Sequence, residues 1–479
     1  MNNIRFMSVV VMVLTLTTFT SCKKWLTVEP KTSIQLNDLL TTETGFRQAL
    51  VGIYTTMNSA SSYGQALSMT TIEHLIANWD VTNGSLEQKL TQGNYLDADV
   101  QTQMLAIYKQ QYNIIANINA ILDQIDQNKA IFKTPGLYEI VKGECLALRA
   151  YCHFDVMRIW GPVPTSSTGG KLPPYVTSFS TQSNPLISFT QFQNMLIKDL
   201  TEAEFLLKGV DPILTSSLKS LSSGEDNPFN YRHLKMNYYA VKALQARAYL
   251  WFGSTKEAYE SASSVISAKD PDGNFKFRLG TSADFGQKDN ELSAEQVFGL
   301  HNSNLNTVYN NTFANGILKR GTTATTVTNQ LYGATGTDIR ETKLWLLVPQ
   351  LSGRNAYVIQ KYNVPAATNL SDFNRIPMLR LSEIYFIAIE TATNLSDAQV
   401  LWNNFRAARG LAPNTLSNDP VLVKNALLAE YRKEFFAEGQ AFYAYKRLNT
   451  PTASMVPKWT PATYNVNYLF PLPNTELQP

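Results

Sequence analysis

The pattern of apolar positions along the chain predicts a protein built largely from paired amphipathic helices. In residues 236–252 apolar side chains recur at steps of three and four, and residues 254–269 repeat the stripe after Gly253, a typical helix stop. The small residues Ala246 and Ala258 allow the two helices to approach closely. This spacing is typical of a tetratricopeptide-type helix pair. Because one pair cannot bury its own apolar face, we expect further pairs beside it.

A second stretch repeats part of this pattern. The motif L-x-x-R-A-Y occurs at residues 146–151 and again at 244–249, which supports repeated helix pairs. The same periodicity predicts further helices at 42–60, 65–77, 100–125, 137–160, 192–207, 379–394, 396–409 and 420–448. The fold class that follows is mostly α, a tetratricopeptide-like helical-repeat body with a large loop-rich insertion.

The insertion spans residues 270–377, where Gly, Asn, Thr and Asp separate short extended pieces such as QVFGLH, TKLWLLV and AYVIQKY. We expect these pieces to form short strands. We also expect the insertion to contact a ligand, because long irregular segments in compact proteins are often functional. The expected organisation is one domain over 22–479 behind a signal peptide at 1–21. Within it we expect a tether (22–41), the helical-repeat body (42–269 and 378–450), the loop-rich ligand-side region (270–377) and an extended C-terminal segment (451–479).

The amino terminus has the features of a bacterial lipoprotein leader. Arg5 precedes an apolar run at 6–19 that is too short for a comfortable membrane span, and small residues then lead to Cys22. We expect lipidation of Cys22, with an ordinary signal peptide and an incidental cysteine as the alternative. Cys145 and Cys152 lie roughly 10 Å apart on one predicted helix, beyond disulfide reach, and are expected to be small buried residues.

The net charge and the aromatic content of the chain indicate which classes of ligand it could bind. A net charge of +3, from 41 basic and 38 acidic residues, does not suggest a nucleic-acid binder. Aromatic residues make up 11% of the chain, which fits either a large aromatic core or a surface that stacks on flat neutral ligands such as sugars.

Catalytic signatures are missing from the sequence. There is no nucleophile elbow, zinc-protease motif, phosphate-binding loop or dinucleotide fingerprint, and the four histidines are scattered. Glu430, Glu434 and Glu438 share one predicted helix face. Paired carboxylates could hydrolyse glycosides, but the interleaved Arg432 and Lys433 favour a salt-bridged structural role. We therefore predict no enzyme, no metal and no cofactor.

Several motifs, taken in order, resemble one family. They are C-K-K-W-L-T-V-E-P at 22–30, L-R-A-Y at 148–151 with W-G-P-V-P at 160–164, P-M-L-R-L-S-E-I-Y-F-I-A-I-E at 377–390, the helix at 430–447 and L-F-P-L-P-N-T-E at 469–476. Behind a lipoprotein leader, this series resembles the SusD/RagB nutrient-binding outer-membrane lipoproteins of Bacteroidetes-type bacteria.

The resemblance implies about four tetratricopeptide-like helix pairs and a non-enzymatic, lipid-anchored protein on the cell surface. Such proteins cover a TonB-dependent outer-membrane transporter (SusC-like) and capture nutrient, commonly oligosaccharide and sometimes peptide, while the helix pairs face the transporter. Two readings outside the family stay open at this point: a surface glycoside hydrolase, and a helical scaffold that faces the periplasm and binds only protein.

The candidate ligand residues come from side-chain chemistry, since the family's ligand loops vary. In the loop at 78–85, Trp79 offers a ring for a sugar, and Asn78, Asp80 and Asn83 offer hydrogen bonds, although Trp79 fits equally as a loop anchor. From the insertion we add Tyr309, Tyr332, Trp345 and Arg340. The alternatives are a turn-stabilising pair of Arg340 with Asp338, and a core position for Trp345.

Overall fold

The computed structural model describes residues 38–164, 171–218, 227–350, 353, 355–364, 374–455, 464 and 466–473. The signal peptide, Cys22 and most of the predicted tether lie outside these residues. The protein is mostly helical, with 54% helix and 7% strand, which confirms the predicted fold class. No helix among the described residues is long and apolar enough to cross a membrane.

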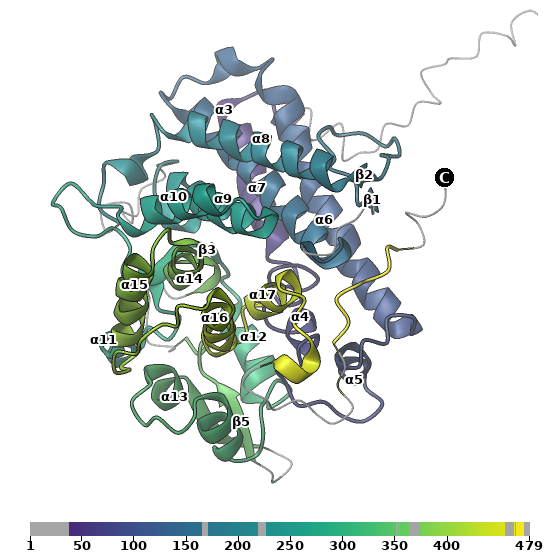
Figure 1. Ribbon diagram of the computed structural model, residues 1–479. Helices are drawn as coiled ribbons and strands as arrows, with labels where there is room; N and C mark the ends of the chain where they lie inside the picture. The colour runs from purple at the N-terminus through teal and green to yellow at the C-terminus, as the bar shows by residue number, and fades with distance from the viewer. Residues whose placement is uncertain are drawn as a thin grey trace, which may run out of the picture.

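Among the described residues, four helix pairs form the body of the molecule (Figure 1). They are α3 (Glu43–Met57) with α6 (Ala98–Ile125), α7 (Leu137–Trp160) with α8 (Phe189–Leu207), α9 (Tyr238–Phe252) with α10 (Thr255–Ile266), and α14 (Leu381–Thr391) with α15 (Leu395–Ala408). Successive pairs pack through α6 on α7, α8 on α9 and α10 on α14. The pair predicted at 236–269 is therefore one unit of a continuous stack.

The arginine of the repeated L-x-x-R-A-Y motif joins neighbouring helices. Arg149 on α7 donates to both carboxylate oxygens of Asp199 on α8, each at 2.8 Å. Arg247 on α9 binds Glu383 on α14 in the same two-pronged way, at 2.7 and 2.5 Å. Because these pairs are buried and bidentate, they fix the orientation of one helix against the next.

The insertion contains the short strands that the sequence predicted. β3 (Gln296–His301), β4 (Trp345–Pro349) and β5 (Asn355–Ile359) coincide with the three extended pieces. β3 pairs antiparallel with β6 (Arg375–Arg380), and β4 with β5. Since β6 runs directly into α14, the β3–β6 pair returns the chain to the helical body.

Apart from the 15-residue helix Pro420–Glu434, the other elements are short. The helices are α4 (Thr71–His74), α5 (Leu86–Thr91), α11 (Ser282–Gly286), α12 (Leu305–Tyr309), α13 (Ile339–Lys343), α16 (Pro420–Glu434) and α17 (Gln440–Arg447). The strands β1 (Lys171–Leu172) and β2 (Ile187–Ser188) form a third antiparallel pair. Single turns of 3-10 or π-helix occur at η3 (Lys129–Ile131), η5 (Pro212–Leu214), η7 (Arg232–Leu234), η8 (Ser293–Glu295), η9 (Asn310–Ala314), η10 (Thr326–Leu331) and η12 (Thr452–Ser454).

Two predicted helices were wrong. Residues 65–77 form turns around the four-residue α4, because the amides of Tyr63, Ala66 and Ile72 each donate to a carbonyl six residues earlier, and Ala77 is left-handed. The predicted helix at 420–448 breaks into α16 and α17, where Ala437 and Gly439 adopt φ values of 65° and 75°.

The carboxylate row on α16 has a structural role. Glu434 is buried and receives hydrogen bonds or ion pairs from Arg340, Arg380 and Arg409. Glu430 pairs with Arg340 at 2.7 Å, and Glu438 pairs with Arg380 at 2.9 Å. The salt-bridged reading is therefore confirmed, although the arginines come from α13, β6 and the end of α15 rather than from α16 itself.

The two cysteines of α7, Cys145 and Cys152, are buried and form no disulfide, as predicted.

The C-terminal segment contacts the helical body. The ring of Phe470 stacks on Tyr95 at 3.9 Å, and the Tyr95 hydroxyl donates to the Asn467 carbonyl. These contacts hold the C-terminal segment against the start of α6.

Candidate functional site

An open cleft with a volume of about 970 Å³ lies between the α4–α5 region and the insertion, which are neighbours in Figure 1. One wall comes from residues 65–90, a second from residues 312–320, and α6 adds Gln103. The lining residues are Gln65, Thr70, Thr71, His74, Trp79, Asp80, Val81, Thr82, Leu86, Glu87, Gln88, Leu90, Gln103, Thr312, Gly316, Ile317, Leu318, Lys319 and Arg320.

Asp80 joins the two walls. Its backbone amide donates to the Lys319 carbonyl at 3.0 Å, and its carboxylate accepts from the Gly321 amide at 2.7 Å. The Arg320 guanidinium lies 3.4 Å from the same carboxylate. Gly321 has a φ of 75°, a left-handed conformation that favours glycine. The loop after α4 is thus attached to the insertion by backbone and side-chain contacts together.

Trp79 forms the floor of the cleft. The indole is 1% exposed, and its Nε1 donates to the Met69 carbonyl at 2.8 Å. Its ring packs edge-on against Phe436 and Phe313, at centroid distances of 4.7 and 5.7 Å. Because all these contacts are internal, the ring supports the cleft without offering a face to a ligand in this conformation.

The cleft presents polar groups of balanced charge. The side chains of Gln65, Thr82 and Lys319 make no hydrogen bond to the described part of the chain, so their donors and acceptors remain available. The acids Asp80 and Glu87 balance the bases Lys319 and Arg320. Ile317 is 66% exposed and adds an apolar contact.

His74 does not add charge to the cleft near neutral pH. Burial lowers the pKa of His74 to about 4, so the ring is neutral above that value. The described residues contain no group of three or more histidines, cysteines or acids placed to hold a metal ion.

The predicted residues of the 78–83 loop take different positions. Trp79 and Asp80 line the cleft. Asn78 is fully buried beneath it, where it donates to Glu73 at 2.5 Å and accepts from Arg432 at 3.0 Å. Asn83 is exposed on the loop and accepts from Gln88. Only two of these four side chains are thus brought together at the cleft.

The four predicted residues of the insertion lie behind the floor. Tyr309, Tyr332, Trp345 and Arg340 are all buried, with exposures of 4%, 3%, 6% and 1%. The Trp345 ring lies 6.4 Å from Trp79 and 4.9 Å from Phe436. Arg340 makes the predicted alternative pair with Asp338, at 2.6 Å. Their contacts are with protein, and a ligand role for them has no support in this conformation.

Sequence reasoning missed most of the polar lining. Gln65 fell within a predicted helix, and Thr82 and Lys319 belong to segments without periodicity. The one available signal was the basic pair Lys319–Arg320 next to Gly321 in a loop-rich segment. No sequence pattern paired that segment with residue 80, which lies 240 positions earlier than Arg320.

Comparisons with known proteins agree with this architecture. A family model described as "Starch-binding associating with outer membrane" matches residues 24–207, and the SusD family model matches residues 281–478. The curated SusD-like protein P25 of Formosa agariphila is 30% identical over 151 residues. The matched stretch is 30% of this chain and spans only 28% of that relative's length.

Solved structures show the same fold over almost the whole chain. A SusD homolog from Bacteroides thetaiotaomicron is 14% identical, with a TM-score of 0.70, over 93% of this chain and 96% of its own. A laminarin-binding SusD-like protein is 17% identical, with a TM-score of 0.64, over 91% of this chain and 98% of its own. The family is a non-enzymatic, glycan-binding one, in line with the prediction that the chain is not an enzyme. With the two family models matching in order along the chain, the protein belongs to the SusD/RagB family.

Proposed function

We propose that this protein is a binding protein of the bacterial outer membrane that captures a neutral oligosaccharide in the cleft between α4–α5 and the insertion. The observation that carries the proposal is the cleft itself. It is large, open, lined by polar side chains and balanced in charge, in a chain whose family model is described as starch-binding. Its size lies within the range of small-molecule sites in proteins, about 300–1,000 Å³.

The lining groups suit a sugar. Gln65 and Thr82 can each donate and accept hydrogen bonds, and Lys319 supplies an ammonium donor, so together they match hydroxyl groups that do both. Ile317 can pack on the C–H face of a pyranose ring. Because the acids and bases of the cleft cancel, a neutral glycan is favoured over a strongly charged one. Trp79 acts in this proposal as the floor that keeps the lining in place.

Binding measurements on the purified protein test the cleft. Isothermal titration with malto-oligosaccharides and with laminarin-derived oligosaccharides is expected to give saturable binding of at least one of them. The double variant Gln65→Ala/Lys319→Ala removes two hydrogen-bonding side chains and is expected to weaken that binding at least tenfold. Lys256→Ala on the exposed face of α10 serves as the matched control and leaves affinity unchanged.

Binding of peptides but of neither glycan would replace this proposal with the peptide-binding alternative. Equal affinity of the double variant and the control would show that the glycan binds elsewhere.

We also propose that the captured glycan passes to a TonB-dependent outer-membrane transporter, and that lipidation of Cys22 holds the protein at that membrane. Support comes from the family and from the leader sequence, which ends in small residues before Cys22. A pull-down of the lipidated protein from gently solubilised outer membranes tests this part. Stoichiometric recovery of a TonB-dependent barrel is expected. Recovery of the protein alone, or with periplasmic enzymes, would contradict the partnership.

A further inference from the structure

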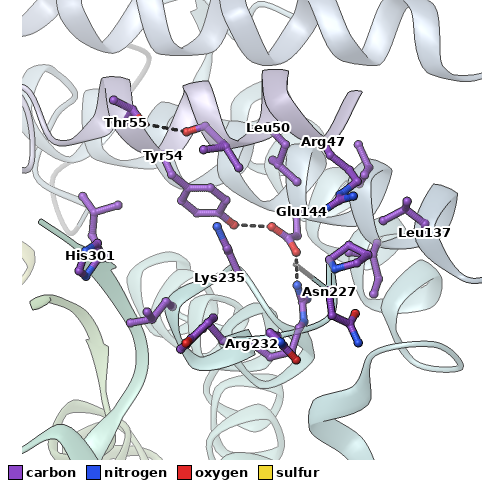
Figure 2. Close-up of a pocket in the computed structure, with 18 of the residues that line it drawn as sticks. Arg47, Leu50, Tyr54, Thr55, Leu137, Glu144, Asn227, Arg232, Lys235 and His301 are labelled. Carbon is purple, nitrogen blue, oxygen red and sulfur yellow. Dashed lines mark hydrogen bonds and ion pairs between the residues drawn. The ribbon is translucent and has the colours of Figure 1, made fainter. Parts of the chain in front are cut away.

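A second cavity, of about 350 Å³, lies in the helical body and shares no lining residue with the cleft. Figure 2 shows it between α3 on one side and the segment 227–235 on the other, with Leu137 and Glu144 contributed by α7 and His301 by the end of β3. Its aliphatic wall consists of Leu50, Leu137, Ile140 and Val141, which are almost fully buried. The mouth carries more polar residues, among them Thr55 and Asn227.

The polar floor of this cavity is already paired. The Tyr54 hydroxyl donates to Glu144 at 2.5 Å and accepts from the Met236 amide at 2.8 Å. The other oxygen of Glu144 accepts from Arg232. Arg232 in turn binds both oxygens of Asp211, at 2.9 and 2.8 Å. Because each of these groups is held from two sides, the floor is rigid and the shape of the cavity is set before any ligand enters.

Lys235 is the exception. Figure 2 shows its ammonium pointing into the space below Tyr54, and the nitrogen lies 4.4 Å from the centre of the Tyr54 ring. Within the described part of the chain, no carboxylate lies within ion-pair distance of this nitrogen and no oxygen accepts a hydrogen bond from it. Burial lowers the pKa of Lys235. This cation–π contact with Tyr54 uses none of the three N–H donors of the ammonium, so the donors remain for a ligand.

The cavity thus combines a rigid floor and an aliphatic wall with one ammonium group that has no acceptor among the described residues. A ligand that fits it needs one anionic group and an apolar body. We propose that this cavity binds a small organic monocarboxylate with an apolar body, its carboxylate on Lys235 and its hydrocarbon part on the wall formed by Leu50, Leu137, Ile140 and Val141. A carboxylate gives the ammonium charged acceptors, and the apolar body removes aliphatic surface from water. This cavity and the glycan cleft have separate linings, so either can bind its ligand without the other.

Titration with 3-phenylpropionate tests the site, with 3-phenylpropionamide as its uncharged counterpart. We expect saturable binding of the acid, at least tenfold tighter than that of the amide. Lys235→Met keeps the length of the side chain but removes the charge, and is expected to reduce binding of the acid at least tenfold. Lys256→Met, an exposed lysine on α10, serves as the control and leaves binding unchanged.

A second variant covers the case in which Lys235→Met fails to fold. Thr55 is exposed at the mouth, so Thr55→Trp is expected to block entry while the protein keeps its melting temperature, with Lys235 intact. The Gln65→Ala/Lys319→Ala variant of the cleft should bind the acid normally, and Thr55→Trp should bind glycan normally. No binding of the acid, equal binding of acid and amide, or full binding by Thr55→Trp would overturn the proposal.

Discussion

At the scale of single residues, Glu434 is the centre of a cluster of buried charges. Its carboxylate is 2% exposed and lies between Arg340, Arg380 and Arg409. Removing one partner of a buried ion pair leaves an uncompensated charge, which typically costs about 3–5 kcal/mol. Glu434→Gln is therefore expected to lower the free energy of unfolding by about that amount, measured by denaturant titration.

The matched control is Glu260→Gln on α10. Glu260 is exposed and lies 3.9 Å from the exposed Lys256, so its loss is expected to change stability by less than about 0.5 kcal/mol. Equal stability of the two variants would show that the buried arginines do not need Glu434.

His153 gives the protein a predictable response to acid. The ring stacks on Tyr175 at 4.0 Å, and its Nε2 accepts from the Val176 amide at 3.1 Å. Burial lowers the pKa of His153 to about 3, below its unfolded value of about 6.5. The unfolded chain thus binds the extra proton between these values. The stability contributed by neutral His153 is complete above about pH 6.5 and is lost towards pH 3, by about 1.4 kcal/mol per pH unit.

His153→Gln keeps an acceptor for Val176 but cannot be protonated. Between pH 6 and pH 4 the free energy of unfolding of the variant should therefore fall less steeply than that of the wild type, by about 1.4 kcal/mol per unit. Denaturant titrations at a series of pH values measure both slopes, and parallel slopes would contradict the assignment.

At the scale of elements, the break between α16 and α17 depends on one glycine. Gly439 has a φ of 75°, and a Cβ there would lie 2.5 Å from the Leu67 carbonyl oxygen. Gly439→Ala is expected to lower the free energy of unfolding by about 2–3 kcal/mol, because it adds backbone strain and a clash. A Cβ added at Gly52 on α3 would meet no atom within 4 Å, so Gly52→Ala should raise stability by about 0.5–1 kcal/mol. Thermal unfolding of the two variants should shift in opposite directions.

The same break shows which elements were predictable. Helices such as α6 and α8 follow directly from their apolar repeat, because each packs through one regular stripe of buried residues. The break at 435–439 carries helix-compatible periodicity in the sequence. It forms because Gly439 packs against the turns at 65–77 and donates to the buried Glu73 at 2.7 Å. The two segments that were wrongly predicted as continuous helices, 65–77 and 420–448, therefore contact each other at Gly439. Local periodicity in the sequence gives no sign of this tertiary contact.

At the scale of the whole molecule, the cleft depends on contacts between distant segments. The loop after α4 was identified from its composition, and Asp80 does line the cleft. The position of Trp79 depends on Phe313, which comes from the insertion, and on Phe436, which lies in the break after α16. Sequence reasoning could name the ring but could not tell which neighbours cover it. The opposite wall, which contains Lys319, could not be predicted either, because its contact with Asp80 joins segments that are far apart in the sequence.

Asp80 is where these distant segments are joined, so it tests whether the cleft works as one unit. Asp80→Ala removes the acceptor for the Gly321 amide and the partner of Arg320. We expect hydrogen exchange of the Gly321 amide to accelerate and glycan affinity to fall about tenfold, because a loosened wall must be ordered again on binding. Asp397→Asn, on the exposed start of α15, is the control and should change neither quantity. Weaker glycan binding with unchanged exchange at Gly321 would instead mean that Asp80 contacts the glycan directly, and that the walls are held together without it.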